Sequence, residues 1–353
     1  MGEGAPNRAG GYRVPAPDRA ARIDWPSDFG TRFTVFVDTE EEFDWGAPFD
    51  RNSRSTTHIA AMPAAHARFA AHGVPLTYLI DYPVATSPHA VDILRRLTED
   101  GRSAIGTQLH PWVNPPFDEE VNGFNSFTGN LPPGLQETKL AALTDAIEAA
   151  FGARPRAYRA GRYGIGADTL ALLARYGYRI DTSMRAAYDY SREAGPDFSA
   201  IGNHAFRSGA MLEVPLTTVF TGWGRGGGPR LYRALAALPK GRGIAARLAM
   251  LSRVALTPEE MPLAEAKEAV RVAVGEGLRL LNFSFHSPSV EPGHTPYVRD
   301  AADLAAFFAW WEAMFTLLGQ LGVAPASLAE ILAVADACGT APASARASVA
   351  GGL

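Results

Sequence analysis

The sequence has few of the features that mark secreted, membrane-spanning or nucleic-acid-binding proteins. Its 353 residues include a single cysteine, Cys338, so no internal disulfide can form and a reducing compartment is expected. No apolar run is long enough to span a membrane, and the first residues lack the hydrophobic stretch of a signal peptide. The formal net charge of −4 gives no reason to expect nucleic acid as a partner. We therefore expect a cytoplasmic protein without a membrane span, whose oligomeric state the sequence does not indicate.

What the sequence does contain suits a large folded domain with short ends. Hydrophobic residues make up 47% of the chain and charged residues 20%, which is normal for a globular core. Residues 1–28 are rich in Gly, Pro and Arg, and residues 338–353 are small and polar. We expect the first to form a flexible arm and the second a flexible tail, with one domain over 29–337.

Strand-like and helix-like segments alternate through this domain. Short β-branched and aromatic runs predict strands at 32–38, 74–81, 102–110, 157–159 and 278–286. Longer amphipathic runs predict helices at 56–73, 88–97, 135–152, 167–178 and 301–318. Repeated strand–helix units imply a parallel sheet, either open and doubly wound or closed as a barrel.

One segment interrupts the alternation. Residues 228–258 resemble one or two amphipathic helices inserted before the next strand–helix unit. A basic amphipathic helix can contact a membrane or a partner, and an inserted helix can equally cap the sheet. The sequence leaves the role of this insertion open.

Unusual polar residues stand at the predicted strand ends. They are Asp38 and Glu40, Gln108 and His110, Arg159, Asp181 and His286. The carboxyl ends of parallel strands share one edge, so these residues can converge although they are distant in sequence.

Their chemistry suits metal-assisted hydrolysis. Asp38 and Glu40, like Gln108 and His110, are two residues apart, so each pair faces one side of an extended segment. A carboxylate and an imidazole from neighbouring strands can hold a divalent metal with positions open for water and substrate. The second carboxylate can then take a proton from that water.

The other strand-end residues complete the set. Arg159 can orient the base, His286 can protonate a leaving amine, and Asp181 can support an imidazole from behind.

Five ordered motifs give the sequence a family resemblance. They are D-T-E (38–40), Q-L-H-P-W (108–112), Y-R-A-G-R-Y-G (158–164), D-T-S (181–183) and F-S-F-H-S-P-S (283–289). Over roughly residues 30–300 the chain resembles the polysaccharide deacetylases of the NodB-homology type, and looks closest to their WalW-like branch. The resemblance implies a distorted (β/α)7-type barrel. It also implies removal of N- or O-acetyl groups from sugars by a metal-bound water, with a place in polysaccharide biosynthesis.

The resemblance assigns roles position by position. It implies Asp38 as base, His286 as general acid, and Arg159 and Asp181 as their respective supports. It implies Glu40 and His110 as metal ligands, with zinc first and manganese, nickel or cobalt as alternatives. The departures from the family pattern are Thr39 between the two acids, Gly161 for a proline, Met184 for a tryptophan, and Gln108 for an expected histidine ligand.

Gln108 leaves three possibilities open. Its amide oxygen could ligate a metal, the site could bind metal only weakly, or the metal could be absent and the pocket bind sugar alone. For substrate binding we expect Trp112, Arg162, Tyr163 and Tyr297. The leading prediction is a metal-dependent carbohydrate deacetylase. The alternatives are a catalytically degenerate sugar-binding protein and an amidohydrolase of a small C–N substrate.

Overall fold

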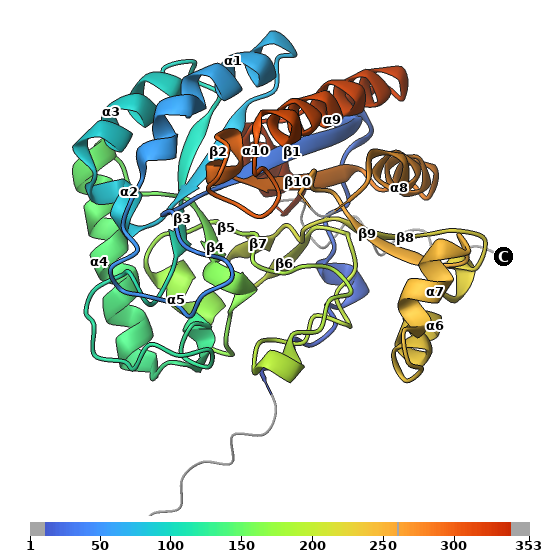
Figure 1. Cartoon of the computed structure of the whole chain (residues 1–353), viewed down its shortest axis with the longest axis horizontal. Coiled ribbons are helices and arrows are strands. Elements are labelled where there is room, and N and C mark those ends of the chain that lie inside the picture. Colours follow the sequence, from blue (N-terminus) through green and yellow to red (C-terminus); the bar gives the residue numbers. More distant parts are fainter. Residues whose placement is uncertain (1–10, 260, 340–353) are drawn as a thin grey trace, which may run out of the picture.

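The computed structural model describes residues 11–259 and 261–339, and its centre is a curled, mostly parallel sheet (Figure 1). The strands follow the order β10-β1-β2-β3-β4-β5-β7-β6, with β11 paired to β1. Their bounds are β1 Thr31–Thr39, β2 Leu76–Ile80, β3 Ala104–Leu109, β4 Ala157–Ala160, β5 Ile180–Asp181, β6 Phe206–Ser208, β7 Met211–Glu213, β10 Leu280–His286 and β11 Val323–Pro325. The curled sheet and its helices confirm the predicted distorted α/β barrel.

Helices cover the outside of this sheet. They are α1 Met62–Ala71, α2 Tyr82–Thr86, α3 Pro88–Leu97, α4 Pro133–Phe151, α5 Thr169–Arg175, α8 Leu263–Gly275, α9 Ala301–Gln320 and α10 Leu328–Gly339. Side-chain caps start several of them, as Asp81 does for α2 and Asp300 for α9. The predicted strands and helices are therefore present, with shifts of a few residues at their ends.

Helix α9 is long and apolar enough to cross a membrane by length and composition alone. In the structure its Trp311 and Met314 are fully buried, and Trp311 lies 5.7 Å from the ring of Phe285 in β10. Such contacts with the sheet are those of a core helix. The packing of α9 against the sheet thus explains its apolar composition.

Strand register places the functional residues opposite one another. Strand β1 is buried on both faces, as parallel strands covered by helices are. Its Asp38 pairs in register with His286 of β10, and Gln108 of β3 pairs with Arg159 of β4. Side chains predicted to meet at the carboxyl edge are therefore brought together by the ladder itself.

The sheet is irregular after β5. Strand β6 runs antiparallel to β7, and a separate hairpin of β8 Thr218–Thr221 and β9 Ser252–Ala255 follows. This hairpin joins the edge of the barrel at β10, where the amide of Ser284 donates to the carbonyl of Leu256 at 3.2 Å. Helices α6 Gly228–Ala236 and α7 Gly241–Arg247 lie between its strands. The predicted insertion at 228–258 thus holds two helices, but its last part is strand β9.

The N-terminal segment corrects another expectation. From residue 11 to 28 it lies against the barrel: Val14 donates to Asp197 at 3.1 Å, Ile23 donates to Ala205 at 2.9 Å, and Trp25 is buried. Apolar side chains at these positions supply the burial that a flexible arm would lack. Residues 1–10 and most of the predicted tail, 340–353, lie outside the described residues; Cys338 belongs to α10.

Candidate functional site

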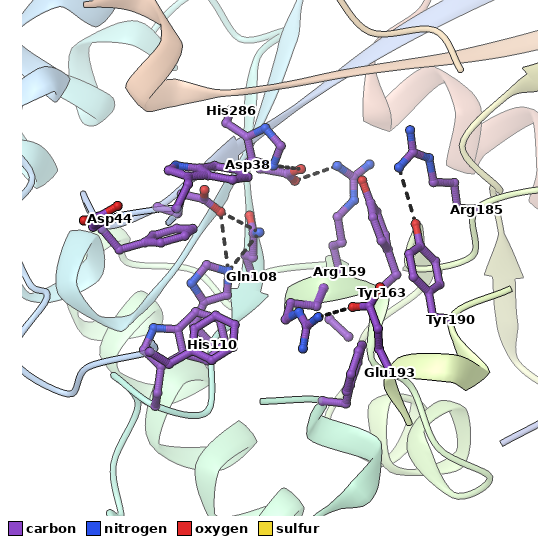
Figure 2. A pocket seen from close by; sticks show the side chains of 18 of the residues that line it. Asp38, Asp44, Gln108, His110, Arg159, Tyr163, Arg185, Tyr190, Glu193 and His286 are labelled. Carbon is purple, nitrogen blue, oxygen red and sulfur yellow. Dashed lines mark hydrogen bonds and ion pairs between the residues drawn. The ribbon is translucent and has the colours of Figure 1, made fainter. Parts of the chain in front are cut away.

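A cavity of about 410 Å³ opens at the carboxyl edge of the sheet (Figure 2). Ten of the residues singled out from the sequence line it: Asp38, Glu40, Gln108, His110, Trp112, Arg159, Arg162, Tyr163, His286 and Tyr297. Its volume suits a single small-molecule ligand.

Asp38 is held by a buried arginine. Arg159 donates to Asp38 Oδ1 at 2.5 Å and to the hydroxyl of Ser284 at 2.6 Å, and both charged side chains are almost fully buried. Arg159 also donates to the carbonyl of Thr182 at 3.1 Å, which fixes the guanidinium in place. One carboxylate oxygen of Asp38 is thus committed to Arg159, and Oδ2 is turned toward His286.

His286 faces Asp38 from the neighbouring strand. Its Nε2 lies 3.7 Å from Asp38 Oδ2, while Nδ1 is 2.8 Å from Glu259 Oε2. Glu259 also accepts from the backbone amide of His286 at 2.9 Å and from Ser289 at 2.6 Å. Burial alone would lower the pKa of His286, but the carboxylates of Glu259, Glu40 and Asp38 raise it to about 10. The imidazole is therefore cationic near neutral pH.

The structure does not bring Asp181 to His286, contrary to the expected support role. Asp181 is buried beside its own strand neighbours: Oδ1 accepts from the Ser183 hydroxyl at 2.6 Å, and the residue pairs in register with Glu213. Strand β5 has only two residues, and Asp181 at its end is not among the residues that line the cavity. Glu259, on the loop after β9, holds the imidazole instead.

Glu40, Gln108 and His110 form a compact group in which the amide of Gln108 is central. Gln108 Nε2 donates to Glu40 Oε2 at 3.0 Å and lies 3.2 Å from His110 Nε2. His110 Nε2 and Glu40 Oε2 are themselves 3.4 Å apart. Burial raises the pKa of Glu40 to about 8, against the lowering effect of His286 and His110. Both hydrogens of the Gln108 amide thus point to the place where a metal ion would be bound by Glu40, Gln108 and His110.

This arrangement does not fit a tightly bound divalent metal. A cation needs lone pairs directed at it, and an NH₂ group in the same position offers hydrogens. In this orientation the amide hydrogens of Gln108 occupy the place toward which ligand lone pairs would have to point. In the present orientation Glu40 Oε1 and Gln108 Oε1 are the atoms of the group left buried without a hydrogen-bond partner among the described residues. The amide thus bridges Glu40 and His110 in place of an ion.

Glu41, Asp81 and His110 form a second buried cluster whose ligand-type atoms lie within 4.8 Å of one another. Hydrogen bonds hold its three side chains in place. Glu41 accepts from His110 Nδ1 and from Trp112 Nε1, each at 2.7 Å, and its amide donates to Asp81 at 2.7 Å. Asp81 caps α2 through the amide of Val84 at 2.9 Å. With Nδ1 donating to Glu41, His110 presents Nε2 as an acceptor to Gln108.

Aromatic side chains enclose the cavity. Trp112 stacks on His110 with ring centroids 4.4 Å apart, and Phe49 lies 4.4 Å from Trp112. Trp45 stands edge-on to His286 at 5.0 Å and to Tyr297 at 5.6 Å. Phe43, Phe49 and Trp45 come from the loop after β1, where the sequence pattern marked only the acids. They make the cavity narrow and apolar on that side.

The floor of the cavity has an unusual backbone. Arg162 and Tyr163 both adopt positive φ, at 53° and 62°. Non-glycine residues seldom adopt this conformation, and those that do are concentrated at functional sites. Gly161 precedes them because a Cβ there would lie 2.4 Å from Cδ2 of His110. The glycine that departs from the family pattern is therefore required by the close approach of His110.

A Ser–His–Glu arrangement lies beneath the cavity. His58 Nε2 is 2.7 Å from the Ser287 hydroxyl, and His58 Nδ1 is 3.0 Å from Glu42 Oε1. Ser287 is fully buried and does not line the cavity, so it cannot act as a nucleophile on a bound substrate. Its hydroxyl accepts from the amide of Glu40 at 3.3 Å, which shows a role in fixing the loop after β1.

No protein-family model matches the chain, and no curated protein sequence matches it. Solved structures do resemble it. PuuE allantoinase superposes with a TM-score of 0.50 at 12% identity, covering 90% of this chain and 93% of that chain. The chain shares that fold.

Two further solved structures are those of deacetylases. A protein of Mycobacterium smegmatis assigned to the polysaccharide deacetylases has a TM-score of 0.49 at 15% identity and covers 91% of this chain and 96% of its own. The peptidoglycan deacetylase PdaC from Bacillus subtilis has a TM-score of 0.39 at 12% identity, covering 87% and 93%. The structural neighbours thus include both deacetylases and an allantoinase.

Proposed function

We propose that this protein hydrolyses the C–N bond of an N-acetyl group on a carbohydrate. The observation that supports the proposal most directly is the pair formed by Asp38 and His286, whose Oδ2 and Nε2 atoms lie 3.7 Å apart in the lining of the cavity. Arg159 holds the first and Glu259 the second, so a base and an acid are fixed side by side at the cavity wall.

The reaction begins with water beside Asp38. Its oxygen attacks the acetyl carbonyl carbon while Asp38 takes one of its protons, which gives a tetrahedral intermediate. The C–N bond then breaks as His286 Nε2 passes its proton to the amine nitrogen. Acetic acid and the free amine leave, the acid ionising to acetate in solvent, and Asp38 returns its proton to His286 across the short gap. The sequence of steps balances without an outside proton donor.

The negative charge on the intermediate requires nearby donors. The imidazolium of His286 supplies one, and the hydroxyl of Tyr163 supplies a second. Burial raises the pKa of Tyr163 well above its usual value, so the phenol keeps its proton and can donate it in a hydrogen bond. We do not carry metal dependence into the proposal, since the amide of Gln108 faces inward between Glu40 and His110.

The shape of the cavity favours a small substrate. Aromatic rings from the loop after β1 and from Trp112 close it on one side, and sugars pack their apolar faces on such rings. A volume of about 410 Å³ holds one sugar unit rather than a length of polymer. We therefore favour a single or terminal acetamido sugar, and the same closure keeps a small non-sugar amide as the second candidate.

We also propose that the chain belongs to the WalW-like branch, because it carries the five sequence motifs. We propose a cytoplasmic location on the basis of the single cysteine and the apolar pattern of the sequence. A sugar-binding protein without catalysis is the outcome if the acid–base pair proves inert.

Acetate release from a panel of N-acetylated monosaccharides and short oligosaccharides tests the proposal. Asp38→Asn and His286→Gln should each lower kcat by about a hundredfold or more, as loss of a general base or acid does. Asp145→Asn and His72→Gln change the same residue types at exposed positions and should leave turnover unchanged. If the protein binds sugars but releases acetate from none of them, the proposal is wrong and the protein is a non-catalytic sugar-binding protein.

A further inference from the structure

The segment between β8 and β9 stands apart from the rest of the barrel in its surface. It carries α6 and α7, which project from the edge of the molecule beyond the hairpin (Figure 1). We call residues 222–251 the α6–α7 insertion. Its return strand β9 leads within a few residues to Glu259, so the insertion is joined closely to the cavity.

The exposed large hydrophobic side chains of the described residues all lie in the α6–α7 insertion. They are Trp223, 75% exposed, Leu238, 59%, Ile244, 51%, and Leu248, 66%. Ile244 and Leu248 are four residues apart on α7, so they share one face. The amide of Trp223 donates to the carbonyl of Ala249 at 3.2 Å, which places the indole-bearing residue beside Leu248. Trp223, Ile244 and Leu248 are therefore neighbours within the α6–α7 insertion.

Charge in this part of the chain is of one sign. No acidic residue occurs between Glu213 and Glu259, whereas the whole chain has more acidic than basic residues. The basic residues of the stretch are Arg225, Arg230, Arg233, Lys240, Arg242, Arg247 and Arg253.

Two of these arginines lie over aromatic rings, Arg242 within the α6–α7 insertion and Arg253 in β9. Arg253 lies over Tyr188 and Tyr232, at 3.4 and 4.9 Å from the ring centroids, and Arg242 lies 4.1 Å from Tyr232. Five others are exposed, so they are available to an anionic partner.

We propose that the α6–α7 insertion is a docking surface for an anionic lipid membrane. Its tryptophan and aliphatic side chains match the headgroup boundary, where an indole and short apolar residues are stable. Its cations match lipid phosphates, while the acidic remainder of the protein is repelled from the same surface. Charge alone or apolar area alone gives weak, reversible binding, and the insertion supplies both. This inference does not depend on the proposed reaction.

Vesicle sedimentation of the full chain tests the proposal. The vesicles are phosphatidylcholine alone and phosphatidylcholine with about one third phosphatidylglycerol. The protein should bind the anionic vesicles and not the neutral ones, and added salt should weaken the binding. The charge-reversed variant Arg225→Glu/Arg230→Glu/Arg247→Glu should bind at least about a hundredfold more weakly, at roughly fivefold for each basic residue lost near the surface.

A matched control separates local charge from total charge. Arg96→Glu/Arg156→Glu/Arg271→Glu makes the same change at exposed positions outside the insertion and should keep most of the binding. Equal losses in the two triple variants would overturn the proposal, because net charge would then explain them. Binding to neutral vesicles as strong as to anionic ones, or no binding to either, would overturn it as well.

The apolar part has its own variant. Trp223→Ser/Leu248→Ser should weaken vesicle binding while leaving its salt dependence, and thermal melts should show both sets of variants folded. A concentration-dependent dimer that this variant abolishes, without vesicle binding in the wild type, would show a second copy of the chain as the partner and contradict a lipid surface.

Discussion

The Gln108→Leu substitution tests the bridging amide directly. In the wild type, the amide nitrogen donates to Glu40 Oε2 at 3.0 Å and to His110 Nε2 at 3.2 Å, and all three side chains are buried. Leucine has a similar volume but no hydrogen to donate. Both acceptors would then be buried without these partners, at about 1–3 kcal/mol each. We expect the free energy of unfolding to fall by about 2–6 kcal/mol, a large part of the ~5–15 kcal/mol typical of a domain.

Urea unfolding in the presence of a strong chelator measures this loss. The chelator should leave the wild type unchanged, because the amide and not an ion joins Glu40 to His110. Gln320→Leu removes an exposed amide at the end of α9 and should change stability by no more than about 0.5 kcal/mol. A wild-type midpoint that falls with chelator and returns with zinc would refute the bridging role, as would a Gln108→Leu variant as stable as the wild type.

Three further predictions concern the cavity. Glu259→Gln removes the largest of the three carboxylate contributions that raise the pKa of His286 to about 10, so the alkaline limit of activity, where the acid loses its proton, should move to lower pH in a pH–rate profile. Gly161→Ala sets a methyl 2.4 Å from His110 and should lower stability by about 1–3 kcal/mol in a thermal melt, with no change if the loop has room to yield. Trp45→Ala should raise KM about tenfold and leave kcat nearly unchanged, whereas a fall in kcat alone would assign the ring to the chemistry.

The sheet and the convergence of its polar ends could be predicted because both follow from local pattern. Buried runs such as β1 are recognisable by their β-branched and aromatic composition, and parallel strands must end on one edge. Asp38, Arg159 and His286 therefore meet as predicted, in adjacent or nearby strands.

What the sequence could not show depends on contacts made late in the chain or across short strands. Glu259 follows β9, whose end is joined to β10 by the backbone bond from Ser284 to Leu256 and not by any motif. Asp181 matched a motif, but a strand of two residues leaves its side chain beside Glu213. The direction of the Gln108 amide, which decides between ligand and bridge, depends on both neighbours together and is not encoded by residue identity.

The most direct test of the proposed function is acetate release by chelator-treated protein on an N-acetylated monosaccharide, beside Asp38→Asn. We expect that the wild type turns over after chelation and that the variant loses at least about a hundredfold in kcat. Turnover that appears only after a divalent metal is added, or that survives in Asp38→Asn, would contradict it.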